Sequence, residues 1–322
     1  MRRILESIPS PSENFFLIGN YQLRYYAVLI LVGIIFAIWI GAVRLKQRGV
    51  DAGVALDVAL WAVPMGIVGA RIFHVLTHLS DYFGKPGIDP LSFLYIWEGG
   101  IAIYGGLIGG VIGAWLGAKS NGVRFLAVAD AFAPGLILAQ GIGRWGNYFN
   151  NELFGIPTNL PWGLEIKTSN PAYPAGLPEG VLFHPTFLYE SLWDILGVFV
   201  LLLLERKLRL QWGRLFAAYL IYYSIGRSLI ESIRIDPSAI ILGLRTNVWS
   251  AIFGVAVGIA LFWWSKRQYP GEELSPYIPG REPNTEETKP AKKSSKKSSS
   301  QDFELDASEV NSDVSDSASK AK

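Results

Sequence analysis

The chain of 322 residues has no cysteine and only three histidines. Without cysteine it forms no disulfide, no thiolate metal site and no catalytic thiol, so any cysteine chemistry here uses a cysteine supplied by a partner. His74 and His78, four residues apart and followed by Asp81, allow a weak metal site, but we favour an interfacial polar role for them. We therefore expect neither a metal nor another cofactor.

Charge is also scarce. Asp, Glu, Lys and Arg make up 17% of the residues, against about a quarter in soluble domains. The net charge of +2 is too small to indicate a nucleic-acid partner, so we expect no nucleic acid. Because half of the residues are hydrophobic, the composition excludes an ordinary cytosolic enzyme and predicts a membrane protein.

Seven apolar segments are long enough to cross the hydrocarbon core as helices, which takes about 20 residues. The segments are Tyr25–Val43, Val54–Ala70, Gly99–Gly117, Phe125–Ile142, Phe187–Leu204, Leu215–Ile230 and Val248–Trp264. They predict an all-α, polytopic integral membrane protein of about seven transmembrane helices.

Lysine and arginine gather in alternate connections between these segments. The residues are Arg44, Lys46 and Arg48, then Lys119 and Arg124, then Arg206, Lys207, Arg209 and Arg214, and finally Lys266 and Arg267. Since basic loops stay on the cytoplasmic side, we expect the N-terminus outside and the C-terminus in the cytoplasm.

Three regions follow from this topology. We expect residues 1–24 to form an extracytoplasmic segment that is not a signal peptide, since polar residues such as Glu13 and Asn14 interrupt it. Residues 25–265 form the seven-helix transmembrane domain. Residues 266–322, rich in lysine, serine and acidic residues, form a disordered cytoplasmic tail.

Glycines repeat every four residues in the third segment, at Gly105, Gly109, Gly113 and Gly117. This spacing places them on one helical face. Because glycine costs about 1 kcal/mol in a helix relative to alanine, such a row needs a reason. We expect another helix to approach this face closely.

Ionisable residues inside predicted spans are costly, by at least about 2.5 kcal/mol at the bilayer centre. Those toward the outer leaflet include Arg71, Arg144, Glu190, Arg227 and Glu231. Several arginines at one depth suggest an anion, because the guanidinium fork fits a phosphate. Arg227, Glu231 and Arg234 are also spaced for mutual pairing, so both interpretations remain open. We expect Asp130, nearer mid-depth, to link helices.

The densest polar stretch is GIGRWGNYFNNELFG, residues 141–155, directly after the fourth apolar segment. It combines an arginine, asparagine amides and a glutamate with closely spaced glycines. These groups can bind a phosphodiester and hydroxyl groups together, while glycine lets the backbone approach the ligand. We interpret the stretch as a headgroup-binding loop at the membrane surface.

This stretch resembles the signature of the prolipoprotein diacylglyceryl transferases, which are bacterial membrane enzymes. The matching residues are Gly143, Arg144, Gly146, Asn147, Asn150, Glu152 and Gly155. Other segments agree in order over about residues 15–265, namely Arg24-Tyr25-Tyr26, Gly69-Ala70-Arg71, Gly105-Gly106-Leu107-Ile108-Gly109, His184-Pro185-Thr186 with Leu188-Tyr189-Glu190, and Gly226-Arg227 with Glu231 and Arg234.

The resemblance implies a reaction and its partners. The family moves the diacylglyceryl group of phosphatidylglycerol onto the thiol of the lipobox cysteine in a prolipoprotein signal peptide, forming a thioether and releasing glycerol phosphate. The implied location is the bacterial cytoplasmic (inner) membrane, among membrane lipids, with the active site toward the extracytoplasmic side. The alternative is a transporter or binding protein for an anionic lipid or solute that uses the same arginines, but we find no internal repeats of the kind transporters have.

The resemblance also implies roles for individual residues. Arg144 and Arg227 hold the phosphate and Asn147 binds headgroup oxygens, while Glu152 and Glu231 orient these groups and Gly155 shapes the loop. The further implied site residues are Tyr26, Arg71 and Arg234.

Tyr104 stands where many members have a histidine. A phenol titrates near pH ~10 and an imidazole near ~6.5. Either Tyr104 is perturbed enough to act as a base, or it hydrogen-bonds the substrate and the thiol loses its proton elsewhere.

Overall fold

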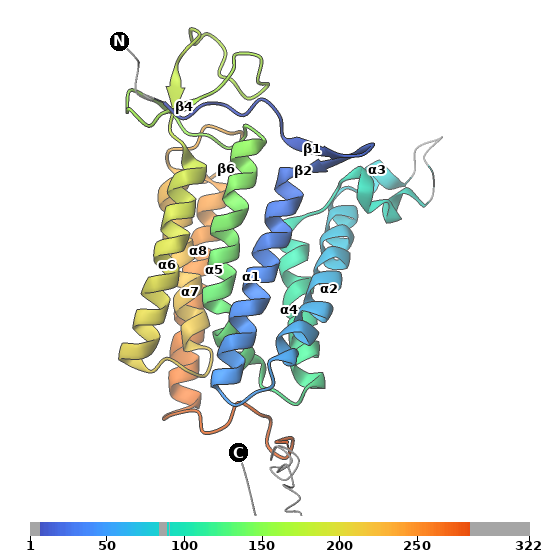
Figure 1. Ribbon diagram of the computed structural model, residues 1–322, viewed down its shortest axis with the longest axis vertical. Coiled ribbons are helices and arrows are strands. Elements are labelled where there is room, and N and C mark those ends of the chain that lie inside the picture. The colour runs from blue at the N-terminus through green and yellow to red at the C-terminus, as the bar shows by residue number, and fades with distance from the viewer. Residues whose placement is uncertain (1–6, 84–88, 90, 284–322) are drawn as a thin grey trace, which may run out of the picture. The chain divides into compact units, whose positions relative to one another are not determined.

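Long helices run side by side through the structure, a computed structural model that describes residues 7–83, 89 and 91–283 (Figure 1). They are α1 (Tyr25–Gln47), α2 (Gly53–Thr77), α4 (Ile103–Ser120), α5 (Phe125–Phe149), α6 (Thr186–Leu208), α7 (Arg214–Glu231) and α8 (Thr246–Gln268). Short helical turns, α3 (Leu79–Tyr82), η1 (Ser92–Leu94) and η2 (Ile96–Glu98), lie between α2 and α4.

Five of these helices, α1, α2, α5, α6 and α8, are long and apolar enough to cross a membrane. Each predicted apolar segment overlaps one long helix. The mostly helical, polytopic membrane fold is therefore as predicted. The other two long helices, α4 and α7, are less apolar. Helix α4 contains glycines and a tyrosine among its apolar residues, and α7 carries three charges, Arg214, Arg227 and Glu231.

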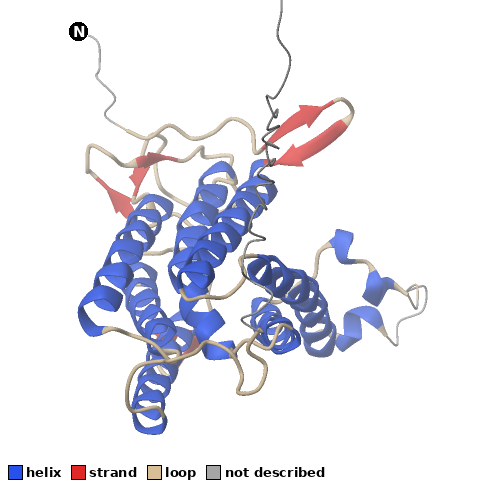
Figure 2. Ribbon diagram, turned by 60° about the horizontal axis from the view of Figure 1, so that its bottom comes forward, coloured by secondary structure: helices blue, strands red, loops and turns tan. Residues whose placement is uncertain are grey.

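The helix α5 lies at the centre, with α1, α6 and α7 packed on it, and α8 packs on α7. Beside them, α2 and α4 form a tight pair (Figure 2). A Cβ on Gly109 would lie 2.1 Å from the Met65 oxygen, and a Cβ on Gly113 would lie 2.4 Å from the Trp61 oxygen. The glycine row thus lets two backbones touch, which confirms the expected close approach.

Small antiparallel sheets, which the all-α prediction missed, lie at one end of the bundle (Figure 1). They are the hairpin β1 (Phe15–Ile18) with β2 (Tyr21–Arg24), the sheet β3 (Pro157–Thr158), β5 (Leu182–Phe183) and β4 (Leu164–Glu165) in that order, and the hairpin β6 (Ile240–Ile241) with β7 (Leu244–Arg245). Strands this short carry too few residues for a period-two pattern to stand out.

The other end of the bundle holds the α1–α2, α4–α5 and α6–α7 connections (Figure 1). Gly213, at φ +82° in the left-handed region that favours glycine, turns the chain into α7. The Asp130 carboxylate accepts the backbone N–H groups of Gly213, at 2.8 Å, and Phe216, at 2.9 Å. Asp130 therefore links α5 to the start of α7, as expected.

The predicted start of the tail, residue 266, differs from the structure. Helix α8 continues to Gln268, and the segment after it pairs with the α4–α5 connection. Arg124 N–H donates to the Pro276 oxygen and Ile278 N–H to the Gly122 oxygen, both at 2.8 Å. Tyr277 also packs on the apolar cluster there, which polar composition alone does not reveal. The rest of the predicted tail, residues 284–322, lies outside the described residues.

Candidate functional site

Glu190, in the first turns of α6, is buried at the end of the bundle that carries the small sheets. Its Oε2 contacts Arg144 Nε of α5, and its Oε1 lies 3.2 Å from Arg227 Nη1 of α7. Arg234 Nη1, beyond the end of α7, lies 3.9 Å from Oε1. One carboxylate thus joins arginines from three separate parts of the chain.

Glu231, the last residue of α7, is fully buried and forms a second junction. Its oxygens lie 2.8 Å from Arg227 Nη2 and 2.7 Å from Arg245 Nε. Asn247 Nδ2 donates to Oε1 at 3.0 Å, and Arg234 Nη1 lies 3.7 Å from Oε2. The mutual pairing that the spacing allowed is therefore present. We call Arg144, Glu190, Arg227, Glu231, Arg234 and Arg245 the arginine network.

Three arginines of the network remain partly accessible. The side chains of Arg144, Arg227 and Arg245 are 18%, 17% and 22% exposed, whereas that of Arg234 is 4% exposed. Arg144 Nη2 donates to the Tyr223 hydroxyl at 3.1 Å. Among the described residues, no hydrogen bond or ion pair uses Arg144 Nη1 or Arg227 Nε. Arg144 and Arg227 thus each keep a donor with which they can bind an anion.

Side chains of the polar stretch at residues 141–155 hydrogen-bond to one another beside this network. Asn147 Nδ2 and Asn150 Nδ2 donate to the same oxygen of Glu152, at 2.8 and 3.2 Å. Glu152 therefore fixes two amides at the end of α5. Gly155 N–H donates to the His184 oxygen at 2.9 Å, and a Cβ on Gly155 would lie 2.8 Å from the His184 Cβ, so this position has no room for a side chain.

Tyr26 of α1 lies against the same stretch. A Cβ on Gly146 would fall 2.1 Å from Tyr26 Cδ2, so the ring occupies the space that a side chain at Gly146 would fill. The two residues belong to separate sequence motifs, and the packing of α1 on α5 brings them together.

The Arg71 guanidinium binds backbone carbonyls. Its Nε donates to the Phe93 oxygen at 2.7 Å, and its Nη groups donate to the oxygens of Ser92, at 2.8 Å, and of Gly99 and Gly100, at 2.5 and 2.9 Å. The expected convergence of Arg71 with Arg144 and Arg227 is absent from these contacts. Because α2 pairs with α4, Arg71 instead fastens the connection between those two helices.

Tyr104 connects α4 to α8. Its hydroxyl lies 2.7 Å from Ser250 Oγ, across from α4 to α8, and the side chain is 44% exposed. The ring also lies near Phe73 of α2, with centroids 6.2 Å apart. Tyr104 therefore ties the α2–α4 pair to the rest of the bundle at the end that carries the arginine network.

The family model described as prolipoprotein diacylglyceryl transferase matches residues 13–264, a range that contains the whole arginine network. The chain belongs to the prolipoprotein diacylglyceryl transferase family. The resemblance seen in the sequence motifs is thereby confirmed.

Members of this family from several bacteria are similar to this chain over most of their length. A phosphatidylglycerol–prolipoprotein diacylglyceryl transferase of Leifsonia xyli subsp. xyli is 52% identical over 289 residues, which cover 86% of each chain. A relative of the same name, numbered 2, from Streptomyces coelicolor is 43% identical over 292 residues, or 90% of this chain and 91% of its own. Another, from Paenarthrobacter aurescens, is 47% identical over 262 residues, or 79% and 82%.

Sequence reasoning missed part of the site in this family member. Glu190 stood out as a costly charge in an apolar segment and as part of the Leu188-Tyr189-Glu190 motif, but neither signal identifies its partners. Arg245, which contacts Glu231 and lies 3.3 Å from Asp236, has no motif of its own. Its position just before the last apolar segment was the one available signal.

Proposed function

We propose that this membrane protein transfers the diacylglyceryl group of phosphatidylglycerol to the thiol of a prolipoprotein's lipobox cysteine. The protein is a transferase by family, and its relatives bear the name of this reaction. The absence of cysteine from the chain is compatible with the reaction, because the nucleophile belongs to the substrate.

We place the reaction at the arginine network. The observation that carries this proposal is that Arg144 and Arg227, from two helices, share Glu190 and keep unused, partly accessible donors. In the reaction a sulfur–carbon bond forms, the carbon–oxygen bond to the phosphate breaks, and glycerol phosphate leaves with the electron pair. Guanidinium groups fixed in advance stabilise the charge on that phosphate without further reorganisation.

The substrate thiol must lose its proton. Positive groups beside it lower its pKa from the free value of about 8.5, which increases the thiolate fraction. Arg144 and Arg227 supply such groups at the proposed site. We assign Tyr104 a hydrogen-bonding role there, since its hydroxyl already exchanges a hydrogen bond with Ser250.

The remaining predicted residues support the network. Glu231 orients Arg227, and Glu152 holds Asn147 for the headgroup oxygens. Tyr26 and Gly155 shape the surface beside them. In this proposal Arg71 acts indirectly, by fixing the α2–α4 connection.

The proposed topology has seven spans, with α4 and α7 crossing the membrane beside the five apolar helices. Basic residues such as Arg44 and Lys266 cluster at the helix ends opposite the network, which supports an outer N-terminus and an inner C-terminus. The network then faces the extracytoplasmic side of a bacterial cytoplasmic membrane, where secreted precursors emerge.

The test uses the purified full chain, phosphatidylglycerol vesicles and a lipobox peptide. Mass spectrometry is expected to detect a diacylglyceryl increment on the peptide cysteine together with released glycerol phosphate. Flux of phosphatidylglycerol between leaflets without any covalent product would instead support a lipid transporter that uses the same arginines.

A further inference from the structure

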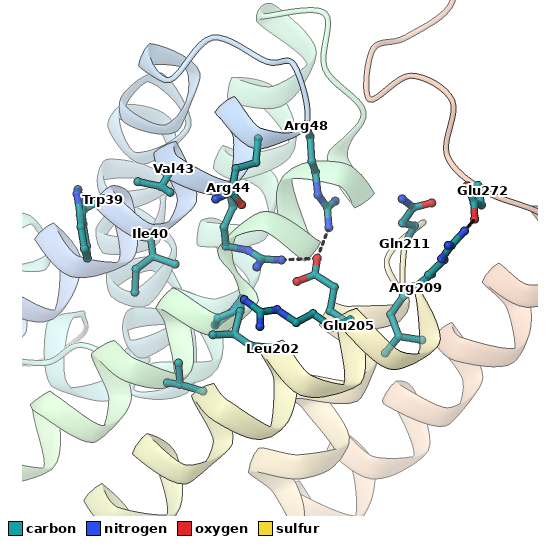
Figure 3. A pocket seen from close by; sticks show the side chains of 15 residues that line it. Trp39, Ile40, Val43, Arg44, Arg48, Leu202, Glu205, Arg209, Gln211 and Glu272 are labelled. Atoms are coloured by element: carbon teal, nitrogen blue, oxygen red, sulfur yellow. Dashed lines mark hydrogen bonds and ion pairs between the residues drawn. The ribbon is translucent and has the colours of Figure 1, made fainter.

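A cavity of about 730 Å³ lies at the end of the bundle opposite the arginine network (Figure 3). Residues of α1 and α6 line it, with Pro134 of α5 between them. Because α1 and α6 both pack on α5 rather than on each other, a groove remains between the two helices. Its volume is within the usual range for small-molecule sites. No residue of the proposed transfer site lines it.

The lining changes character along the helix axis. Deeper in the bundle it is apolar, formed by Trp39, Ile40, Val43, Val198 and Leu202. Trp39 is 60% exposed, so this part of the groove opens on the outer surface of α1. One or two turns further on, the lining becomes charged, and Figure 3 shows Arg44, Arg48 and Arg209 around this part. The groove is therefore apolar at membrane depth and basic where the helices end.

One arginine of the lining has no carboxylate partner among the described residues. Arg44 and Arg48 share Glu205, at 2.6 and 3.0 Å, and Arg209 pairs with Glu272. Arg48 Nη1 also lies 4.0 Å from Asp130 Oδ2 and 3.9 Å from Glu273 Oε2. The fourth arginine, Arg206, has no ion pair or hydrogen bond with any residue that the structure describes. Arg206 is therefore the arginine of the lining whose charge no described carboxylate offsets. This unpaired charge lies beside the apolar part, because Arg206 follows Leu202 by one turn of α6.

We propose that this groove binds one anionic diacyl phospholipid of the cytoplasmic leaflet. The phosphate lies at Arg206 and Arg209, and an acyl chain runs along Val43 and Leu202. A soluble anion would leave the apolar half of the groove uncovered, whereas a lipid satisfies both halves. The leaflet depends on the proposed topology, but the site is separate from the transfer site.

Native mass spectrometry of the full chain in detergent tests this proposal. The Arg144→Ala background weakens the proposed transfer site, so that binding at the groove dominates. Dioleoyl phosphatidic acid is the probe, and the zwitterionic dioleoyl phosphatidylcholine is the comparison. We expect one retained phosphatidic acid, and about tenfold weaker binding when Arg206→Gln and Arg209→Gln are combined, since charge-assisted contacts to the phosphate are lost.

The control is Lys207→Gln, which removes one positive charge at the position after Arg206 on α6, outside the cavity lining. It is expected to leave binding unchanged. Leu202→Trp, which fills the apolar half without altering charge, is expected to weaken binding as well. Equal binding by the combined arginine variant, or displacement of the lipid by millimolar glycerol phosphate, would overturn the proposal.

Discussion

Glu190 holds Arg144 and Arg227 on one carboxylate, although the two arginines come from different helices. Oε2 contacts Arg144 Nε and Oε1 lies 3.2 Å from Arg227 Nη1. Buried charges need partners, and this arrangement supplies them while leaving one donor on each arginine unused. The site is therefore organised before an anion arrives.

Glu190→Gln is expected to lower diacylglyceryl transfer by about tenfold to a hundredfold. The neutral amide keeps one hydrogen-bond acceptor but cannot balance two guanidinium charges, so the arginines lose their fixed positions. Peptide mass spectrometry measures the rate, and elution in detergent checks the fold. The exposed Glu179→Gln is the control. Unchanged transfer by Glu190→Gln would mean that this carboxylate does not position the arginines.

Tyr104→Phe is expected to lower transfer less than tenfold. The substitution removes the hydroxyl that meets Ser250 but keeps the ring beside Phe73. Ser250→Ala, which removes the other half of the same hydrogen bond, should have a similar effect. Complete loss in Tyr104→Phe with normal transfer in Ser250→Ala would instead identify the hydroxyl as a group that acts on the substrate.

Gly109→Ala is expected to destabilise the α2–α4 pair by about 1–3 kcal/mol, because its new Cβ would meet the Met65 oxygen at 2.1 Å. Gly110→Ala is the matched control, since the nearest atom to its Cβ lies 3.9 Å away. Thermal unfolding in detergent compares the two. Equal unfolding temperatures would contradict the close approach of these helices.

Asp130→Ala is expected to lower the free energy of unfolding by about 1–3 kcal/mol, because the N–H groups of Gly213 and Phe216 lose their buried acceptor. Asp51→Ala serves as comparison, since Asp51 accepts a single exposed N–H, that of Gly53, at 2.7 Å. The readout is again the unfolding temperature. A larger loss in Asp51→Ala would show that Asp130 is not the link between α5 and α7.

Much of the fold was predictable because it depends on patterns between residues that are close in the sequence. Apolar length located the long helices, and the four-residue glycine period located the α2–α4 contact. The i, i+4 spacing of Arg227 and Glu231 also predicted their pairing. In each case the interacting groups lie on one helix or repeat along one helix.

The rest depends on how distant segments meet. No spacing relates Glu190 to Arg144, 46 positions earlier, or brings Arg245 to Glu231. Arg71 occupies a motif position, yet its donors bind backbone carbonyls, and a sequence does not report where carbonyls point. Residues 270–282 were predicted to belong to the tail because their composition is polar. In the structure their backbone pairs with the α4–α5 connection, a contact that composition does not reveal.

The most direct measurement is the rate of diacylglyceryl transfer to a lipobox peptide by Arg144→Ala and Arg227→Ala, followed by mass spectrometry. Arg267→Ala, in the exposed last turn of α8, is the matched control. We predict that the first two variants elute as folded protein and lose transfer by a hundredfold or more, about 2.7 kcal/mol, while the control retains it. Normal thioether formation by either network variant would contradict the proposed site.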